Sequence, residues 1–488
     1  MSTGAVEAGR AARWRLSLAS PWALAVWAAT VLYAVVLSAE SVYAHTTFAT
    51  GFDSAIYDQR LWLLANWQEP FSTVVSRPFL ADHFEPGLVL LTPLYWVGFD
   101  LPGLLVAQSI GLALTAPALF ALARAYGSSP AVGALPAFLW LASPAVAAPN
   151  LFDFRPATFA PALIVLSVLA AKQERHWLLA ITAILALSLK EDIALVYVVF
   201  GLLLVLHSKR RVGATLAVGS ASCAVIGTVL IRSLGEQFQW QGRRFAGDRG
   251  DSFVDVVLWA VQHPLTTFGD FVGPSLIDLA VLVLSTAGLA LLAPSWMLLA
   301  APTAVYNALS AYEPQHTLIY HYHLQTLTAV SVAAAIGSSR VSSLGRLGRR
   351  LVAVGIGSAL AIALVAGIVQ HDPWDVRSAD ERSEISQALD RIPPGAPVAA
   401  APYLLPHLSH RVEVYSLPEP FIPIDWGSPL TPADFAERAK RVRFAVLHRG
   451  TKPVEYLGSM AKVRRMLSEE GFVPIRTGTY VQLLERRR

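Results

Sequence analysis

The stretch WLLAITAILALSLKEDIALVYVVFGLLLVLHSKRR, Trp177–Arg211, decides the architecture of this chain. Two apolar runs flank a charged triplet, residues 190–192, and a basic cluster follows the second run. The stretch is too long for one ordinary bilayer crossing of about 20 residues and short for two. One crossing would place Lys172 and Lys209 on opposite sides of a membrane, whereas two keep them together. Because positive loop residues gather at the cytoplasmic face, we expect two short crossings.

The same rule orders the whole chain, which alternates apolar runs with polar loops. We predict eleven spans: Pro21–Leu37, Leu101–Ala123, Ala131–Ala148, Pro156–Ala171, Trp177–Leu189, Ile193–Leu206, Val212–Ile231, Pro274–Ala293, Ser295–Leu309, Tyr322–Ile336 and Leu351–Val369. If these cross alternately, the basic clusters share one side, which is then the cytoplasm. Of the 19 acidic residues before Asp372, only Glu7 and Glu174 lie on that side. Carboxylate chemistry would therefore belong to the outer face.

The composition agrees with a membrane protein. The chain has 488 residues, 54% hydrophobic and 15% charged, which is too apolar for a soluble protein of this size. The basic inner loops account for the net charge of +4, so no nucleic-acid partner is indicated. A single cysteine, Cys223, excludes intramolecular disulfides and cysteine-rich metal sites. No small-residue cleavage site follows the first span, so we expect a retained helix rather than a signal peptide.

Three regions are predicted: a cytoplasmic tail (1–20), a transmembrane body (21–370) and a soluble extracytoplasmic α/β domain (371–488). The last region turns abruptly polar and carries 15 of the 34 acidic residues. Its expected strands are Val398–Ala400, Val412–Tyr415, Phe444–Leu447 and Tyr480–Leu484, and its expected helices are Pro432–Lys440 and Tyr456–Glu469.

A long first outer loop, residues 40–100, contains the apolar run Pro86–Phe99. This run is too short for a comfortable crossing and holds Pro93. Were it to cross, every later basic cluster would move outside. We therefore expect a juxtamembrane or re-entrant helix on the outer face.

Ionisable side chains at the outer ends of six segments form the candidate site, because such groups are costly at membrane depth and usually functional. They are Asp53, Asp58, His83, Glu85, Asp153, Arg155, Lys190, Glu191, Asp192, Arg243, Arg244, His321 and His323, with Arg232 nearby. The predicted topology brings all of them to one membrane boundary.

Asp53 and Asp58 are the candidates for a general base that activates an acceptor hydroxyl. Five residues apart, they would sit about 140° from each other on one helix and could not share a ligand. A helix that begins at Asp53 would make this residue its N-cap. The structural alternative for the pair is therefore a cap and a solvated acid.

The other acidic and histidine candidates also have structural alternatives. Capping explains Glu85 about as well as function does, and a metal-ligand role for His83 has no diagnostic spacing. Asp153 and Arg155 could form a simple turn pair. His321 and His323 could anchor the chain at the interface, as Tyr and His often do.

The charged triplet and the outer basic residues are harder to explain as structure alone. Three adjacent charges at residues 190–192 would be expensive without partners or water. Guanidinium groups bind phosphate oxygens bidentately, so Arg243 and Arg244, with Lys190, suit a lipid phosphate.

Six motifs carry a family resemblance: GFDSAIYDQRLW (51–62), DHFEPGLVLLTPLY (82–95), NLFDFRPATFAP (150–161), LSLKEDIAL (187–195), IYHYH (319–323) and LLPHLSHRVEVY (404–415). Together they resemble domain-of-unknown-function family 2079. This is a group of bacterial polytopic membrane proteins related to the GT-C glycosyltransferases. The resemblance runs from about Phe52 to about Tyr415.

The resemblance implies a mainly α, GT-C-like fold with about eleven spans, outer juxtamembrane helices and a small C-terminal α/β domain. It also implies transfer of a sugar from a polyprenyl-phosphate donor to an acceptor outside the bacterial plasma membrane. The acidic catalytic residue of the first outer loop maps onto Asp53, with Asp58 next. Arg155 stands where we would expect His after Asp-Phe, which weakens any shared metal or proton-transfer role there.

We therefore expect a membrane glycosyltransferase in which Asp53 or Asp58 deprotonates the acceptor. The residues expected to hold the leaving phosphate are Lys190, Arg243 and Arg244. The residues expected to shape the acceptor pocket, or to bind an optional divalent ion, are His83, Asp153 and His321. The expected partners are a lipid-linked sugar donor, a cell-envelope glycan, lipid or protein as acceptor, and membrane lipids.

Two other functions are compatible with the sequence. A transporter or lipid flippase could use residues 190–192 as a gate, but such proteins commonly show repeated halves, and this chain has none that we detect. A scaffold that presents the C-terminal domain to envelope partners is the third class.

The charge asymmetry predicts a cytoplasmic location for Arg124, Arg175, Arg211 and Arg346, and an outer location for Tyr43, Asn150 and residues 371–488. Cysteine-accessibility labelling in intact cells tests this topology. Labelling at position 410 but not at 346 is expected, and the reverse pattern would overturn it.

Overall fold

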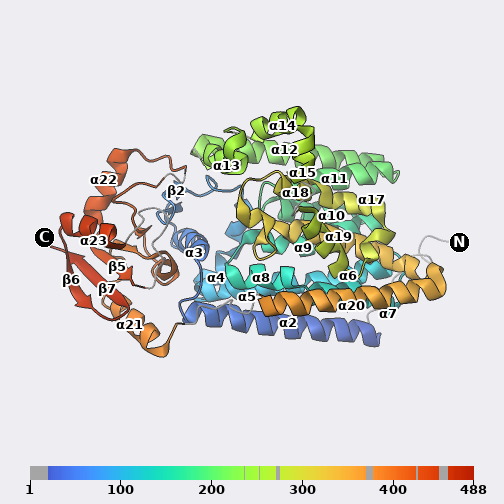
Figure 1. Ribbon diagram of the computed structural model, residues 1–488, viewed down its shortest axis with the longest axis horizontal. Helices are drawn as coiled ribbons and strands as arrows, with labels where there is room; N and C mark the ends of the chain where they lie inside the picture. The colour runs from blue at the N-terminus through green and yellow to red at the C-terminus, as the bar shows by residue number, and fades with distance from the viewer. Residues whose placement is uncertain are drawn as a thin grey trace.

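A computed structural model of the chain describes residues 20–235, 237–251, 253–270, 275–369, 377–424, 427–449 and 460–487. A long helical body and a smaller unit built on a β-sheet lie end to end along the longest axis of the molecule (Figure 1). The first helix, α2 (Pro21–Thr46), and α20 (Gly345–Val369) run along one side of the body (Figure 1).

Five helical segments are long and apolar enough to cross a membrane. They are α2, Asp100–Ala125 (α5, Asp100–Ala113, and α6, Thr115–Ala125), Pro130–Phe152 (α7, Pro130–Leu141, and α8, Pro144–Phe152), α12 (Arg210–Leu234) and His321–Leu344 (η8, His321–His323, α19, Leu324–Gly337, and η9, Ser338–Leu344). Shorter apolar helices accompany them: Pro156–Lys172 (η2, Pro156–Phe159, and α9, Ala160–Lys172), α10 (His176–Leu187), α11 (Ile193–Leu206), α16 (Leu276–Ser285) and Val352–Val365 within α20. The number of crossings stays a prediction.

The stretch that decides the architecture forms two helices, α10 and α11, as its charged interruption predicts. Helix α11 then packs closely against α12. A Cβ atom on Gly201 would lie 2.6 Å from the carbonyl oxygen of Gly213, so the two backbones meet where neither residue has a side chain. The predicted span Ser295–Leu309 is broken into α17 (Pro294–Met297), η6 (Leu298–Ala300) and α18 (Ala301–Ala308).

Two connections carry further helices. The run Pro86–Phe99 forms η1 (Pro86–Leu91) and α4 (Pro93–Trp96), and each is far too short to cross a bilayer. Between α12 and α16 lie α13 (Gln237–Ala246), η3 (Gly247–Arg249), α14 (Phe253–Gln262) and α15 (Pro264–Asp270). Helices α13 and α14 cover the outside of the body beside α12 (Figure 1).

The C-terminal unit contains a five-stranded sheet in the order β4-β3-β5-β7-β6. Its strands are β3 (Val398–Ala400), β4 (Val414–Ser416), β5 (Phe444–His448), β6 (Phe472–Thr477) and β7 (Val481–Arg486). Strands β4, β3 and β5 are parallel, and β7 pairs antiparallel with β5 and β6. Its helices are α21 (Ala379–Leu389), η10 (Pro402–His407), α22 (Pro432–Arg441) and α23 (Met460–Glu469).

All four predicted strands are present, whereas β6 and α21 were not predicted. The predicted helix Pro432–Lys440 corresponds to α22. Of the predicted helix Tyr456–Glu469, the part from Met460 onward is α23, and its first residues lie outside the described residues.

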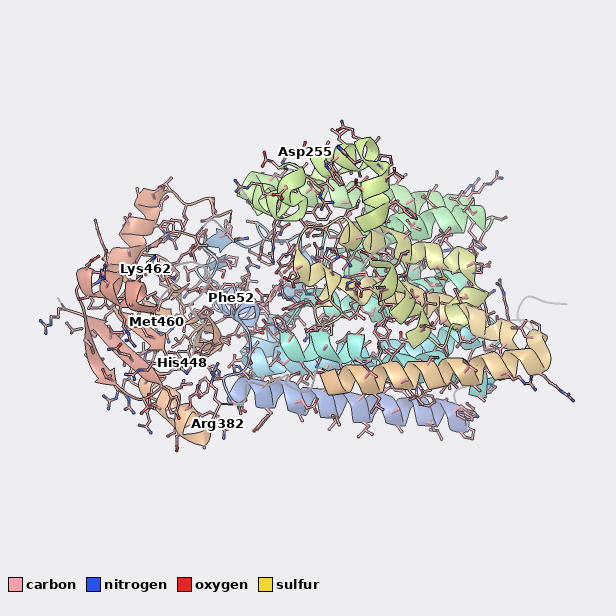
Figure 2. All side chains as sticks on the ribbon, in the orientation of Figure 1. Phe52, Asp255, Arg382, His448, Met460 and Lys462 are labelled. Atoms are coloured by element: carbon pink, nitrogen blue, oxygen red, sulfur yellow. The ribbon has the colours of Figure 1, made fainter. Side chains whose placement is uncertain are left out.

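The first loop and the C-terminal sheet share one hydrophobic core. From the loop, Ala55 and Ile56 of α3 (Phe52–Ala65) and Val74 are buried in it, and from the C-terminal unit so are Val398 and Leu483. Figure 2 shows that Phe52, which opens α3, lies where the body meets the sheet unit. The loop between Ala65 and Pro86 therefore belongs structurally with the last quarter of the chain.

Buried hydrogen bonds reinforce this core. The side chain of Gln59 donates to the Thr73 hydroxyl (2.9 Å) and to the Arg411 carbonyl (3.1 Å), while its oxygen accepts from the Thr73 backbone N–H (2.9 Å). The Thr73 hydroxyl in turn donates to the carbonyl of Val414 on β4 (2.7 Å). Since these groups are buried, losing one partner would leave another unsatisfied.

A core substitution in the first loop should destabilise both parts together. Ile56 is 5% exposed, so Ile56→Ala should lower the free energy of unfolding by about 2–5 kcal/mol. Thermal unfolding and limited proteolysis of the C-terminal unit measure the effect. Ile475→Ala is the control, because Ile475 on β6 is 41% exposed. Equal effects of the two substitutions would contradict the shared core.

Candidate functional site

The site begins with the N-terminus of α3, which is held by a distant carboxylate. Asp153 accepts hydrogen bonds from the backbone N–H groups of Asp53 (3.2 Å) and Ser54 (3.1 Å) and from the Ser54 hydroxyl. A Cβ atom on Gly51 would lie 2.4 Å from Asp153 Oδ2, so glycine leaves room for this contact. Helix α3 begins at Phe52 with Gly51 as its N-cap, so the predicted N-cap role of Asp53 is wrong.

This capping explains why the prediction failed. The free N–H groups at a helix start need an acceptor, and here Asp153 supplies it from 100 residues away. Burial raises the pKa of Asp153 to about 7, although the hydrogen bonds from Ser54 and Gly51 act in the opposite direction. Its predicted part in an acceptor pocket stays a prediction beside this structural role.

Capping by Asp153 leaves the side chain of Asp53 free to turn toward Arg155, with which it forms an ion pair. Arg155 is also held at its backbone, where its N–H donates to the side-chain oxygen of Gln108 (2.7 Å). Asp53 remains 28% exposed and Arg155 17%, so a ligand that reaches the pair could compete for the guanidinium. Burial lowers the pKa of Arg155 to about 10.

Two predicted residues from other segments, His321 and Lys190, lie near this pair. His321, which opens η8, lies within electrostatic reach of Arg155, Lys190 and His83. The Lys190 ammonium lies 5.9 Å from the centre of the Tyr322 ring, and Tyr322 is itself close to Arg155. The structure therefore brings the first loop and the segments at residues 153–155, 190–192 and 321–323 together.

Two members of the charged triplet pair with each other, and the third pairs with the first loop. Lys190 pairs with Asp192 at 2.8 Å. Glu191 accepts from His83 Nδ1 (2.8 Å) and from the backbone N–H of Phe84 (3.0 Å). Although burial opposes charge here, Asp192 and Glu191 hold the pKa of Lys190 above its usual range.

The ion pair between His83 and Glu191 shifts the pKa of both groups. Burial favours the neutral ring of His83, but the Glu191 carboxylate outweighs it and raises the pKa of His83 to about 9. Burial likewise opposes ionisation of Glu191, yet His83 and Lys190 lower its pKa. The first loop is thus tied to the α10–α11 connection by a charged hydrogen bond.

Behind His83 lies a buried cluster that the sequence did not single out. Arg77 and Arg60 are almost fully buried and both contact Asp82, at 2.9 and 3.5 Å. The Arg77, His83 and Arg60 charges overcome the burial of Asp82 and lower its pKa. The DHFEPG motif contains Asp82, but Arg60 and Arg77 lie elsewhere in the first loop and were not among the predicted residues.

Glu85 and Asp58 are buried acids with different surroundings. One oxygen of Glu85 accepts from the Tyr57 hydroxyl (3.2 Å), and the other is buried without a hydrogen-bond partner in the part of the chain that the structure describes. Burial raises the pKa of Glu85 to about 7. Asp58 is 1% exposed and accepts from the hydroxyls of Tyr95 (2.5 Å) and Ser409.

His410 completes the surroundings of Asp58. Its Nε2 lies 3.3 Å from the Asp58 carboxylate, and although burial favours the neutral ring, this contact raises the pKa of His410. Asp58 therefore joins α3 to the C-terminal unit. Its role as a base stays a prediction that competes with this structural one.

The remaining predicted residues lie at the edge of the site. The Arg244 guanidinium of α13 lies 3.2 Å from the centre of the Tyr312 ring and is within electrostatic reach of Arg155. Arg243 is exposed on the same helix, and Arg232 is exposed near the end of α12. His323 faces away from the other candidates, toward Asp278 of α16 at 3.9 Å.

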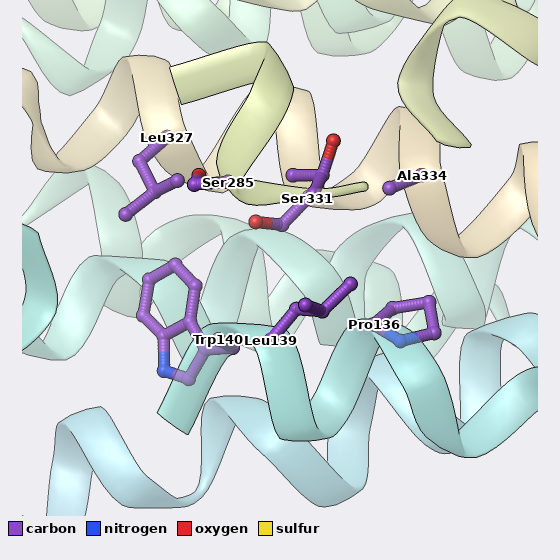
Figure 3. Close-up of a pocket in the computed structure, with 8 residues that line it drawn as sticks. Pro136, Leu139, Trp140, Ser285, Leu327, Ser331 and Ala334 are labelled. Carbon is purple, nitrogen blue, oxygen red and sulfur yellow. The ribbon is translucent and has the colours of Figure 1, made fainter. Parts of the chain in front are cut away.

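A pocket lies deeper in the helical body, away from these charges. It is bounded by Pro136 and Trp140 of α7, by Ser285 at the end of α16, and by Leu327 and Ser331 of α19 (Figure 3). The Ser285 hydroxyl is satisfied by the carbonyl of Leu282 in its own helix (2.7 Å). Its apolar lining makes it a packing crevice rather than a site for a charged headgroup.

Among the described residues, no group of three or more His, Cys, Asp or Glu side chains is arranged to hold a metal ion. This part of the chain therefore offers no ligand set for the optional divalent ion.

Comparisons with known proteins bear on the family and the fold. The family described as "Predicted membrane protein (DUF2079)" matches residues 44–425. The search of curated proteins gives no match. Among solved structures, the chain is similar to ArnT from Cupriavidus metallidurans, whose crystal structure is bound to undecaprenyl phosphate. The TM-score is 0.56 with 10% identity over 95% of this chain and 98% of that one. At this identity the similarity concerns the fold, and it confirms the predicted mainly α, GT-C-like architecture.

Because of the His83–Glu191 pair, the stability of the protein should decrease as the pH becomes alkaline. The pKa of His83 rises from 6.5 to about 9 on folding. The contribution of the charged pair to the free energy of unfolding is therefore complete below pH 6.5 and is lost as the pH rises through 9. Thermal unfolding in nanodiscs between pH 6 and 10 should show this loss. His83→Asn should be destabilised at pH 6.5, and its difference from wild type should narrow toward pH 10. His176→Asn, which changes an exposed ring, is the control. A constant difference across this range would refute the pairing.

Proposed function

Because this chain belongs to the DUF2079 family of predicted membrane proteins, we propose that it is an integral-membrane glycosyltransferase. It takes a sugar from a polyprenyl-phosphate donor and transfers it to an acceptor of the cell envelope outside the membrane. The acceptor is a glycan, a lipid or a protein.

The observation that carries the proposal is the convergence of buried cations at one end of the helical body. Arg155 and Lys190 come from different segments, and His321 lies within electrostatic reach of both. Arg244 lies at the edge of the same cluster. Cations are held at such depth only when they are paired or when they serve a ligand, and a phosphate monoester is a suitable anion for them. The ArnT-like fold supports the choice of lipid, because that protein was solved with undecaprenyl phosphate.

In the proposed mechanism, Arg155 binds the donor phosphate with two guanidinium N–H groups. Asp53 orients this guanidinium before the donor arrives, since the pair is already formed in the free protein. Lys190, held by Asp192, adds a second positive charge. As the bond between the anomeric carbon and the phosphate oxygen breaks, negative charge grows on the phosphate. Preorganised cations stabilise that charge more in the transition state than in the ground state.

The pairing of Asp53 bears on which group takes the proton of the acceptor. A carboxylate in contact with a guanidinium is held in its ionised form and is a weaker base than a free carboxylate. Asp53 can serve as the base only when the donor phosphate draws Arg155 away from it. Asp58 already accepts hydrogen bonds from the hydroxyls of Tyr95 and Ser409 and lies beside His410.

Binding of undecaprenyl phosphate to the purified full chain in nanodiscs tests the proposal directly. Arg155→Ala should weaken binding at least tenfold, because a guanidinium–phosphate contact at a desolvated site contributes about 1.5–3 kcal/mol. Arg155→Lys should restore only part of it, since lysine lacks the bidentate geometry. Arg175→Ala is the matched control, because Arg175 is exposed in the loop between α9 and α10.

The outcome also separates the competing functions. Binding that depends on Arg155, together with release of the lipid phosphate from a sugar-linked donor, supports transfer. Binding without release, but with movement of the lipid between leaflets in proteoliposomes, would favour a flippase. Equal binding by wild type and Arg155→Ala would remove the phosphate site from the proposal.

A further inference from the structure

An uncharged side chain in the helical body binds the turn that carries the candidate phosphate ligand. Gln108 lies on α5, within the segment Asp100–Ala125 that is long and apolar enough to cross a membrane. It is 0% exposed, and it was not among the predicted site residues. A buried amide is costly in such a place unless its nitrogen and its oxygen both find partners.

The partners of Gln108 among the described residues belong to the turn that leaves α8 and to η2, which follows it. Nε2 donates to the carbonyl oxygens of Asn150 and Asp153, at 3.1 Å each. Oε1 accepts from the backbone N–H of Arg155 at 2.7 Å and lies 3.2 Å from the Thr158 hydroxyl. Both the nitrogen and the oxygen of the amide are therefore engaged by one short stretch of chain.

This pattern differs from the way in which polar side chains in a span commonly satisfy themselves. Thr328 of α19, for example, donates to the carbonyl of Leu324 in its own helix (2.7 Å). Gln108 instead contacts residues that lie 42 to 50 positions later in the chain. Its side chain therefore holds another segment in place.

The turn needs such a partner because its backbone is extended but belongs to no strand. Asp153 and Arg155 both have extended φ and ψ angles. In a sheet, the N–H and C=O groups of an extended segment bond to the neighbouring strand. Here the amide of Gln108 takes the place of that strand, because it bonds the carbonyl of Asp153 and the N–H of Arg155.

The same contact fixes the direction of two side chains of the candidate site. Asp153 and Arg155 are two residues apart in extended backbone, so their side chains leave the chain on the same side. Both meet the start of α3, where Asp153 caps the helix and Arg155 pairs with Asp53. Gln108 therefore holds the backbone from which both contacts are made.

We propose that Gln108 is a positioning residue for the phosphate site. It holds the backbone of Arg155 at a fixed place in the helical body, so that the guanidinium is aimed before a donor arrives. This assignment rests on the proposed function, because Gln108 acts only through Arg155. Gln108 itself touches neither the donor phosphate nor the acceptor.

Preorganisation is the physical reason why this amide affects affinity. A guanidinium that must first be brought into place loses part of its binding free energy to that ordering. An apolar side chain at position 108 would leave the N–H of Arg155 and the carbonyl of Asp153 without their present partners. The turn would then move to satisfy them elsewhere, and the guanidinium would move with it.

A double-mutant cycle with Arg155 tests the positioning role. Binding of undecaprenyl phosphate to the full chain in nanodiscs is measured for wild type, Gln108→Met, Arg155→Ala and the double variant. Methionine keeps the approximate volume but makes no such hydrogen bonds, so Gln108→Met should weaken binding about three- to tenfold. In the Arg155→Ala background the same substitution should change binding by less than about twofold, because the residue that Gln108 positions is gone.

A purely structural role would give a different pattern. It would lower the melting temperature and would weaken binding by the same factor in both backgrounds. That result, or wild-type affinity of folded Gln108→Met, would overturn the proposal. Ser167→Ala is the matched control, because it also removes buried hydrogen bonds inside the helical body, and it should leave binding within about twofold of wild type.

A second measurement does not depend on the lipid. Hydrogen exchange followed by mass spectrometry should show faster exchange in peptides that contain Arg155 in Gln108→Met than in wild type, with no change in α9. Unchanged exchange would mean that Gln108 does not hold the turn, and would also overturn the proposal.

Two further outcomes have a defined reading. If Gln108→Met is not recovered folded, Gln108→Asn replaces it in the same cycle, because its amide ends one methylene short of the turn. If wild type does not bind undecaprenyl phosphate, the proposed function fails instead, while hydrogen exchange still decides whether Gln108 holds the turn.

Discussion

The structure depends on ion pairs that are buried where the helical body meets the sheet unit. An unpaired charge at such a place costs more free energy than most single interactions contribute. The buried ions therefore lie beside oppositely charged side chains. Asp82 gathers Arg60 and Arg77, and Glu191 fixes His83. Each of these pairs joins segments that are distant along the chain or turns the first loop back on itself. The path of the loop is therefore set by electrostatics as much as by apolar packing.

Much of the fold could be predicted, because it depends on local patterns. The charged interruption at residues 190–192 predicts two helices, and two helices are present as α10 and α11. The long apolar runs predict the helical body, and short apolar runs within the polar C-terminal region predict strands such as Val398–Ala400. Strand β6 was missed because Pro474 interrupts it and Phe472 is its one fully buried side chain, so it lacks the pattern of a buried strand. Such a strand forms because a neighbouring strand, here β7, pairs with it, and its own sequence pattern does not predict it.

The candidate site was predicted as a set of residues, but its pairings could not be. Sequence spacing places Asp53 near the start of a helix, yet it cannot show that Asp153 would cap that helix and leave Asp53 to Arg155. The orientation of His323 toward Asp278 is equally invisible, because it depends on how η8 turns between two helices. The local sequence shows which residue types are present and that they lie near a membrane boundary. Which side chains contact one another depends on how the whole chain folds.

The shared core of the first loop and the C-terminal sheet has a consequence for biosynthesis. Val74 and Val75 are made early, whereas their partners, such as Ile385 and Leu483, are made more than 300 residues later. At about 5–20 residues per second, this gap lasts on the order of 15–60 s. Throughout that time the loop exposes apolar side chains and cannot complete its fold. If translation stops before the last strands, the released chain has its helices but an unfolded first loop that proteases can cleave. Only a full-length chain can therefore complete the fold of its first loop.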